Sequence, residues 1–303
     1  MEGSTFYHRP VMLDEAVAGL DIVASGTYVD ATFGGGGHSK EILKSLDDCG
    51  RLVAFDHDSD AWRNKPDDDR LVEVRENFRY MKRFLKLHGI FEVDGILADL
   101  GVSSYQFDTG ERGFSIRFDG PLDMRMDNRT ELTAETILNT YSEKDLHKLF
   151  EQYGEVRNSI QLARHIVENR EKMQLNSIDS LKALLEPVMK GNQNKYLAQV
   201  FQALRIEVND ELGALKDLLE QSVQCLKSGG RLCIITFHSL EDRMVKQFMK
   251  TGVWGEIEKD VFGREVQERM MKPLQSKPID PTEKEIKENP RARSARLRIG
   301  VRL

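Results

Sequence analysis

The sequence predicts an α/β fold, in which a mainly parallel, Rossmann-like sheet is interrupted by a small inserted all-helical domain. Short apolar strands alternate with helical segments up to residue 99, and a further strand pattern follows residue 230, which is typical of a parallel sheet. Between them, residues 133–190 have helical patterns throughout. With 303 residues and an apolar share of 40%, the chain can bury a sizeable core.

The first half of the sheet is expected before residue 100. A glycine-rich turn at residues 34–37 separates the first strand from a helix, because glycine lets the backbone turn without Cβ clashes. The second strand ends at Asp56. The predicted strands are residues 28–33, a strand closing at 56, 71–74 and 93–99, with a helix at 80–87. Residues 100–130 are rich in Gly, Ser, Asp and Arg and predict a long ordered loop, which is usually functional.

The helical insert has clear start and packing signals. Ser142 and Asp145 have capping-box spacing, and Gly154 marks a stop. Two apolar stripes at helical spacing are expected in a core: Leu146, Leu149, Phe150 and Tyr153, and then Leu181, Leu184, Leu185 and Val188. The predicted domains are therefore residues 1–108, the insert 109–203, and residues 204–303.

After the insert the sheet pattern resumes. A helical pattern runs from residue 197, and an apolar face from Leu212 to Leu226 ends at a glycine pair, residues 229–230. A strand is expected at 231–237 and a helix near 240–250. The charge-rich stretch 251–290, with prolines near its end, predicts a loop or flap. The final ARLRIGV predicts a last, edge strand.

The glycine turn and Asp56 predict a nucleotide-cofactor pocket. A helix that starts after the turn presents free N–H groups to a ligand. Asp56 follows Gly36 by 20 residues, the offset expected of an acidic ribose ligand in such units. A dinucleotide fingerprint would place a third glycine where Ser39 stands, which disfavours an NAD enzyme. The alternative is a glycine-rich turn without a ligand.

Composition sets limits on partners and compartment. The formal net charge of −6 gives no global attraction to nucleic acid or membrane, so a nucleic acid must meet local basic patches. Three cysteines without C-x-x-C spacing argue against disulfides and zinc and favour a reducing cytoplasm. No apolar stretch predicts a membrane span or a signal peptide. We expect a cytoplasmic protein without membrane partners.

Several motifs in one order carry a family resemblance. TFGGGGHS, DLGVSS, ERGFS, GPLDMRMD, FQALRI, ITFHSLEDR and NPRARSA run from near His8 to near Arg298. Together they resemble the bacterial MraW family, the S-adenosylmethionine-dependent methyltransferases H of small-subunit ribosomal RNA. The resemblance implies a class I, Rossmann-like methyltransferase that transfers a methyl group from S-adenosyl-L-methionine to the exocyclic N4 of a decoding-site cytosine in 16S rRNA. It leaves open whether the chain is a monomer or a homodimer.

The resemblance also implies roles for individual residues. The cofactor contacts would be Gly36, Gly37, His38, Asp56, Phe78, Asp99 and Gln106, with Phe78 near the adenine and Asp99 and Gln106 toward the methionine end. Amino-methyltransferases commonly have an Asp/Asn/Ser-Pro-Pro-aromatic motif, whereas this chain has Asp99-Leu100-Gly101-Val102. Whether Asp99 touches the target amine or only the cofactor therefore stays open.

Transfer to cytosine N4 makes its own chemical demands. The N4 lone pair is delocalised into the ring, so the enzyme must align N4 with the methyl group and accept a hydrogen bond from the amine. No metal is needed. Asp99 is the first catalytic candidate, and Ser103 and Ser104 are the next. Asp123 and Arg125 are candidates for the base pocket, each with the alternative of an ordinary loop residue.

RNA contacts are expected at local basic clusters, although a charge run is more often only a solvated surface. Arg291 and Arg293 are the first candidates. The remaining members are Arg296, Arg298 and Arg302 at the C-terminus, Arg70, Arg75, Arg79, Lys82, Arg83 and Lys86 in a second cluster, and Arg157, Arg164 and Arg170 in the insert.

Other chemistries are disfavoured. His238 and Ser239 lack a G-x-S-x-G elbow, and Ser239 with Asp242 instead predicts a helix N-cap. The run DHDSD at 56–60 lacks the glycine of a calcium loop. The open alternatives are a DNA cytosine-N4 methyltransferase, an NAD-dependent dehydrogenase and a non-catalytic RNA-binding or ribosome-assembly protein.

Overall fold

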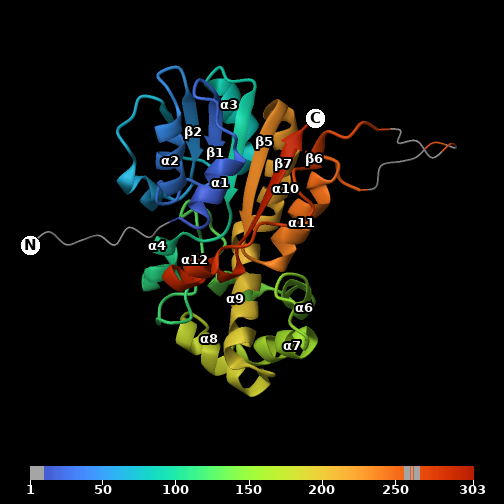
Figure 1. The fold of residues 1–303 in the computed structure, drawn as a ribbon. Coiled ribbons are helices and arrows are strands. Elements are labelled where there is room, and N and C mark those ends of the chain that lie inside the picture. Colours follow the sequence, from blue (N-terminus) through green and yellow to red (C-terminus); the bar gives the residue numbers. More distant parts are fainter. Residues whose placement is uncertain (1–9, 256–259, 261, 263–266) are drawn as a thin grey trace, which may run out of the picture. The chain divides into compact units, whose positions relative to one another are not determined.

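The structure is a computed structural model that describes residues 10–255, 260, 262 and 267–303, without the side chains of Asn64, Ser104 and Tyr105. His8 and the side chain of Ser104 therefore lie outside the described part, as does much of the stretch predicted as a flap after residue 255. By its internal contacts the chain divides into a sheet unit, Met1–Gly101 with Gly213–Leu303, and a helical unit, Val102–Leu212 (Figure 1).

The unit boundaries fall at 101/102 and 212/213, whereas the sequence placed the insert at 109–203. Helix α9 (Gln193–Asn209) explains the later exit, because its buried residues up to Val208 pack in the core of the helical unit. The earlier entry reflects residues 102–130, which pack against that core through Val102, Leu122 and Met124.

The sheet unit is built on one seven-stranded sheet with the order β3-β2-β1-β4-β5-β7-β6. The strands are β1 (Thr27–Asp30), β2 (Arg51–Phe55), β3 (Leu71–Val74), β4 (Val93–Asp99), β5 (Leu226–Thr236), β6 (Met271–Pro273) and β7 (Arg296–Arg302). The first five pair in parallel, and β7 is antiparallel to both β5 and β6. The predicted α/β class with a Rossmann-like, mainly parallel sheet is confirmed.

The prediction that the last strand lies at the edge is wrong. Strand β7 lies between β5 and β6, and β6 forms the edge. The sequence hides β6 because it has only three residues and ends in Pro273, and a proline is tolerated at an edge where no ladder donor is required.

Helices cover both faces of the sheet. One face packs against α1 (Leu13–Gly19) and α2 (Gly37–Ser45), and their apolar residues share a core with β2, β4 and β7. The other face packs against α3 (Met81–Leu87), α10 (Glu211–Cys225) and α11 (Ser239–Met249). A further short helix, α12 (Glu283–Glu288), precedes β7. Strand β4 is buried at Val93 and from Gly95 to Ala98, as expected of a strand covered on both sides.

The helical unit has its own apolar core. Its helices are α4 (Ser104–Asp108), α5 (Ala134–Thr140), α6 (Glu143–Gln152), α7 (Ser159–Asn169), α8 (Ile178–Leu185) and α9. Ser142 caps α6 by accepting the Asp145 N–H at 3.2 Å, which confirms the predicted helix start. The predicted loop 100–130 contains α4 and a 3-10 turn at Gly110–Arg112. Across the described residues, no helix combines the length and apolar character needed to cross a bilayer.

Candidate functional site

Three candidate groups gather at one edge of the sheet unit. Because β1, β2 and β4 are parallel neighbours, their carboxyl ends meet at the same edge. The glycine turn follows β1, Asp56 follows β2, and Asp99 is the last residue of β4. The sequence therefore brings together, at this edge, the elements expected of a nucleotide pocket.

The glycine turn has a built shape. Gly36 has φ 74° and caps α2, and a Cβ on it would lie 2.7 Å from the Phe33 ring. A Cβ on Gly37 would lie 2.0 Å from Pro10 Cγ, so the chain before α1 packs directly on this glycine. Gly35 is exposed, and a Cβ there would meet none of the described residues within 4 Å. The turn is thus packed against Phe33 and Pro10 at Gly36 and Gly37 and is exposed at Gly35.

The Asp56 carboxylate is tied to the turn. Its Oδ2 accepts the Gly34 N–H at 2.8 Å, and its Oδ1 accepts the Asp58 N–H at 2.9 Å. Each oxygen keeps a further lone pair for a ligand. Burial raises the pKa of Asp56 to about 7, against the opposing effect of the two backbone donors.

A buried polar group that the sequence did not single out lies beside the turn. Asp30, the last residue of β1, is fully buried, accepts the Ser39 hydroxyl at 2.6 Å and accepts the Thr32 N–H at 3.1 Å. Burial raises its pKa. Ser39, which replaces the third glycine of a dinucleotide fingerprint, is thus the partner of this carboxyl. An acidic residue that ends a buried strand before a glycine turn is the signal that could have found it.

His38 connects the turn with Asp99. Its Nε2 lies 3.1 Å from the Val11 carbonyl oxygen, and its Nδ1 lies 3.8 Å from Asp99 Oδ2. Burial lowers the pKa of His38, so the neutral ring is favoured. The side chain therefore holds the segment before α1 and faces the Asp99 carboxyl.

Asp99 combines a fixed backbone with a buried carboxyl oxygen. Its backbone N–H donates to Thr32 Oγ1 at 2.7 Å, which fixes the end of β4 to the turn. Its Oδ1 is buried and has no hydrogen-bond partner among the described residues. Burial raises its pKa well above the ordinary value, and the nearby carboxyls Asp30, Glu241 and Glu285 raise it further. A buried acceptor without a partner is costly unless a ligand meets it.

Phe78 begins the short 3-10 turn Phe78–Tyr80 after β3, at the same edge of the sheet. The ring is only half-buried, and it packs against the core that contains α3 and α10. Phe78 thus follows β3 as expected from the sequence, and its contact with the adenine stays a prediction.

The candidates in the helical unit form local contacts. Ser103 N–H donates to the Gln106 carboxamide oxygen at 2.9 Å, and Gln106 N–H donates to Ser103 Oγ at 3.3 Å. Arg125 and Asp123 form a two-pronged ion pair, Nε–Oδ1 2.8 Å and Nη2–Oδ2 2.7 Å. Arg125 also donates to the carbonyl oxygen of Thr130, so this pair closes its own loop.

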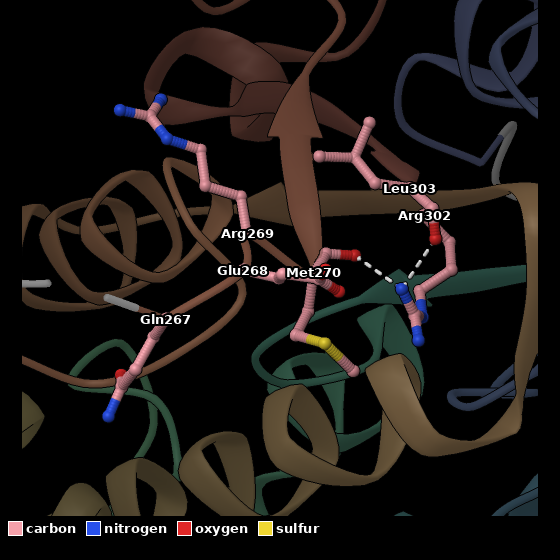
Figure 2. A pocket seen from close by; sticks show the side chains of 6 residues that line it. All are labelled: Gln267, Glu268, Arg269, Met270, Arg302 and Leu303. Atoms are coloured by element: carbon pink, nitrogen blue, oxygen red, sulfur yellow. Dashed lines mark hydrogen bonds between the residues drawn. The ribbon is translucent and has the colours of Figure 1, made fainter. Parts of the chain in front are cut away.

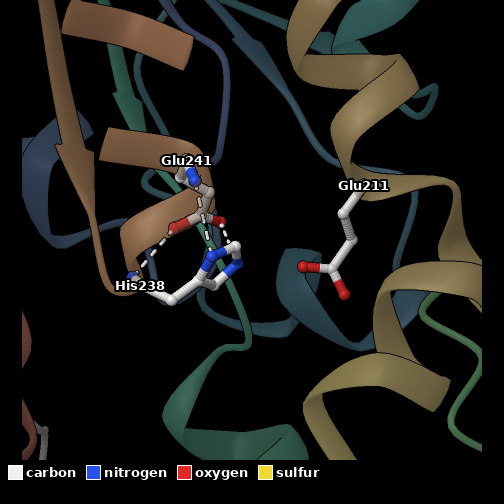
Figure 3. A group of neighbouring side chains, drawn as sticks. All are labelled: Glu211, His238 and Glu241. Carbon is white, nitrogen blue, oxygen red and sulfur yellow. Dashed lines mark hydrogen bonds and ion pairs between the residues drawn. The ribbon is translucent and has the colours of Figure 1, made fainter. Parts of the chain in front are cut away.

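The predicted N-cap of α11 is wrong by one residue. His238, not Ser239, caps the helix, with the Glu241 N–H 3.4 Å from His238 Nδ1 (Figure 3). In return Glu241 Oε2 accepts the Phe237 N–H at 2.9 Å, and Glu241 Oε1 lies 3.2 Å from His238 Nε2. Asp242 is not the partner because it pairs with arginines of β7. Glu211, drawn in the same figure, belongs to the helical unit and pairs there with Arg205.

Some of the arginines predicted to bind RNA instead form contacts within the sheet unit. Arg298 is buried and pairs with Asp242, Nε–Oδ1 2.6 Å, and Arg296 reaches the same carboxylate at 3.1 Å. Arg302 donates to the carbonyl oxygens of Val223 and Met270. These three arginines hold β7 in place. Because Arg298 is buried and paired, its prediction as an RNA contact is wrong. Arg291 is half-buried and Arg293 exposed, both in the 3-10 turn Pro290–Ser294.

A separate surface hollow lies beside the end of β7. It is lined by Gln267, Glu268, Arg269, Met270, Arg302 and Leu303, and Figure 2 shows the Arg302 guanidinium turned to the backbone there. Val301 pairs with Arg231, which pairs with Gly95 near the start of β4. The hollow therefore lies away from the carboxyl ends that carry the site.

Known proteins resemble this chain over nearly its full length. The model of the MraW methylase family matches residues 5–302. The ribosomal RNA small subunit methyltransferase H of Flavobacterium psychrophilum is 54% identical over 291 residues, covering 95% of this chain and 99% of its own. That of Cytophaga hutchinsonii is 54% identical over 302 residues, covering 98% and 99%. Among solved structures, the rRNA methylase of Streptococcus thermophilus covers 96% of this chain and 93% of its own at 10% identity and a TM-score of 0.41, too distant to support an argument.

The family match and the identity of these relatives agree with the topology and with the order of the sequence motifs. The chain therefore belongs to the MraW methylase family.

Proposed function

We propose that this protein transfers a methyl group from S-adenosylmethionine to the exocyclic N4 of a decoding-site cytosine in 16S rRNA. Membership of the methylase family and relatives named as small-subunit ribosomal RNA methyltransferases support the reaction and the RNA. The target atom rests on the resemblance and on the chemistry of the site. The names of the relatives say nothing of a second copy, so the homodimer stays an open alternative.

The residues at the sheet edge fit this cofactor. The open face of Gly35 leaves room for a ligand against the backbone, and Asp56 is a fixed acceptor for ribose hydroxyls. Gly36 and Gly37 shape the turn, and Phe78 offers an apolar surface for the adenine. When bound, S-adenosylmethionine supplies an electrophilic methyl group on a sulfonium ion.

Asp99 is the observation that carries the proposal. Its buried Oδ1 without a partner is an acceptor available to an N4 amine. A carboxylate whose pKa is raised is a stronger base than an exposed one. Asp99 would therefore accept the N4 hydrogen bond and take the N4 proton as the N4–methyl bond forms and the methyl–sulfur bond breaks, with S-adenosylhomocysteine as the leaving group. The neutral His38 ring faces the Asp99 carboxyl, with Nδ1 3.8 Å from Oδ2, and is part of its surroundings.

The remaining candidates complete the proposal. Ser103 and Ser104, which closely follow Asp99 in the sequence, are secondary catalytic candidates, and Gln106 is a candidate for the methionine end of the cofactor. Asp123 and Arg125 would order the loop that meets the base, since each already satisfies the other. Arg293, which is exposed, and Arg291 are the candidates for phosphate contact.

The test is methyl transfer from tritiated S-adenosylmethionine to small subunits of a strain that lacks the activity, followed by nucleoside analysis. We expect N4-methylcytidine, and about a hundredfold or greater loss of rate in Asp99→Asn, which keeps the shape but not the base. Calorimetry with S-adenosylhomocysteine shows that each variant still binds cofactor. Cofactor-binding protein that forms no N4-methylcytidine would sink the proposal, and transfer to DNA instead would favour the DNA alternative.

A further inference from the structure

We propose that Trp62 is a positioning residue for the cofactor pocket. Its indole ring supports the glycine turn and holds the backbone of Asp56. The inference rests on the proposed function, because that function assigns the turn and Asp56 to the cofactor. Trp62 lies in the 3-10 helix Ser59–Asn64, which follows Asp56.

The first contact of Trp62 is with the floor of the turn. Its ring stacks on Phe33, with centroids 4.5 Å apart and an angle of 7° between the planes. Phe33 in turn lies under Gly36, because a Cβ on Gly36 would meet the Phe33 ring at 2.7 Å. The Gly36 N–H also donates to the Phe33 carbonyl oxygen at 2.7 Å. The position of the Phe33 ring therefore determines where the backbone of Gly36 lies.

The second contact of Trp62 is with Asp56. The indole Nε1–H donates to the Asp56 carbonyl oxygen at 3.2 Å. The carboxylate of the same residue accepts the Gly34 N–H, so the turn and Asp56 are joined on both sides. Trp62 is the one described side chain that contacts both Phe33 by stacking and Asp56 by a hydrogen bond.

Trp62 belongs to a small cluster rather than to a main core. Phe33, Ala54 and Trp62 form an apolar group apart from the larger clusters of the sheet unit, with Ala61 and Leu71 packed against it. Only 7% of Trp62 is exposed, so it does not offer its ring face to a ligand. Its effect on the cofactor is therefore exerted through Phe33 and Asp56, and it should change cofactor affinity without changing the chemical step.

Two substitutions separate the contacts. Trp62→Phe keeps an aromatic ring against Phe33 but removes the Nε1–H, and Trp62→Leu removes both contacts. The matched control is Trp254→Phe, because Trp254 is the other tryptophan of the chain, packs on Phe248 in the same unit, and has an Nε1 without a described partner. All variants are compared by circular dichroism before binding is measured.

Calorimetry with S-adenosylhomocysteine gives the primary readout. We expect the Kd to rise about threefold to tenfold in Trp62→Phe, the effect of one lost neutral hydrogen bond, and further in Trp62→Leu. Trp254→Phe should stay within twofold. In methyl transfer, KM for S-adenosylmethionine should rise in parallel while kcat stays within twofold. A folded Trp62→Phe or Trp62→Leu with parental Kd, or one that loses kcat at unchanged KM, would overturn the inference.

Fluorescence gives a second, independent readout. In the Trp254→Phe background Trp62 is the only tryptophan, and its emission should change on saturation with S-adenosylhomocysteine because the turn and Asp56 become ordered against the ligand. The Trp62→Phe protein should show no such change. A silent Trp62 at saturation contradicts the inference. Because both readouts use cofactor alone, a failure to methylate N4 would count against the proposed function and leave this inference standing.

Discussion

At the scale of single residues, Asp56 offers the clearest test of the cofactor pocket. Its carboxylate accepts two backbone N–H groups, and in the proposed function it accepts ribose hydroxyls as well. We expect Asp56→Ala to weaken S-adenosylhomocysteine binding by about 1.5 to 3 kcal/mol, because a hydrogen bond to a charged acceptor is lost. Isothermal calorimetry measures this.

Asp47 provides a matched control for Asp56→Ala. Its carboxylate also accepts two backbone N–H groups, from Cys49 at 2.8 Å and Gly50 at 3.1 Å, but it precedes β2 rather than following it. Asp47→Ala should leave cofactor affinity unchanged. Equal losses in both variants would mean that turn stability, rather than ribose contact, determines the affinity.

The pKa of Asp56 makes a second prediction at this scale. Burial raises it to about 7 in the folded protein, so the charged acceptor is present above that pH and is lost as pH falls through it. As the pH is lowered from 8 to 6, the affinity for S-adenosylhomocysteine should therefore fall by about the same factor as the ionised fraction of Asp56. In Asp56→Asn this part of the pH dependence should be absent, and an unchanged profile would assign it to another group.

The pairing of site residues could be predicted only in part. Asp56 and Asp99 follow strands, and strand ends at one sheet edge are visible in the sequence. Asp30 was missed because the predicted first strand, residues 28–33, ran past it, whereas β1 ends at Asp30. The two contacts of His38, to Val11 and Asp99, depend on packing between segments 27 and 61 residues away, which no local pattern encodes.

At the scale of elements, substitutions at two glycines of the turn should separate effects on ligand binding from effects on folding stability. Gly35 has open space where a Cβ would stand, whereas Gly36 has φ 74° and meets Phe33. Gly36→Ala should destabilise the protein by about 1 to 2 kcal/mol, since the left-handed conformation is strained for alanine. Gly35→Ala should keep the melting temperature but weaken S-adenosylhomocysteine binding. If Gly35→Ala binds the ligand as well as the parent protein, the ligand does not approach this face.

A second element-scale prediction concerns the contact between α11 and β7. Asp242 and Arg298 are both buried and paired. Burial alone would raise the pKa of Asp242, but the bonds and charges of Arg298 and Arg296 lower it overall. The stability it contributes is therefore present above the ordinary carboxyl pKa and is lost as pH falls through the lowered folded value.

Asp242→Asn should cost about 3 to 5 kcal/mol, because it leaves the Arg298 charge buried without its counter-ion. Urea unfolding at neutral pH measures the loss. The exposed pair of Asp179 and Lys182 is the control, and Asp179→Asn should cost less than about 1 kcal/mol. A small loss in Asp242→Asn would mean that the contact is supported by packing alone.

The elements themselves were well predicted where their signals are long or buried. The parallel strands show continuous apolar runs, and α6 has both a capping residue and an apolar stripe. Strand β6 and the order of β7 were not predictable, because three residues carry no pattern and sheet order is set by pairing partners. The cap of α11 was misplaced because Asp242 serves Arg298, a contact across 56 residues.

At the scale of the whole molecule, the chain carries separate apolar cores in its two units. The large cluster that contains Leu146 lies wholly within the helical unit, and the clusters of the sheet lie within the sheet unit. All the candidate cofactor contacts except Gln106 belong to the sheet unit. Cofactor binding should therefore report on the sheet unit and be largely independent of the stability of the insert.

Matched core substitutions test that independence. Leu146 in α6 and Leu218 in α10 are both fully buried, and replacing either with alanine should cost about 2 to 5 kcal/mol. In thermal unfolding, a hundredfold excess of S-adenosylhomocysteine over its Kd should stabilise the sheet unit by about 2.7 kcal/mol. Leu146→Ala should lower the melting temperature of the helical unit, which the ligand does not raise. Leu218→Ala should lower the melting temperature of the sheet unit, which the ligand does raise. A single transition that responds equally to the ligand and to both substitutions would show instead that the units unfold as one.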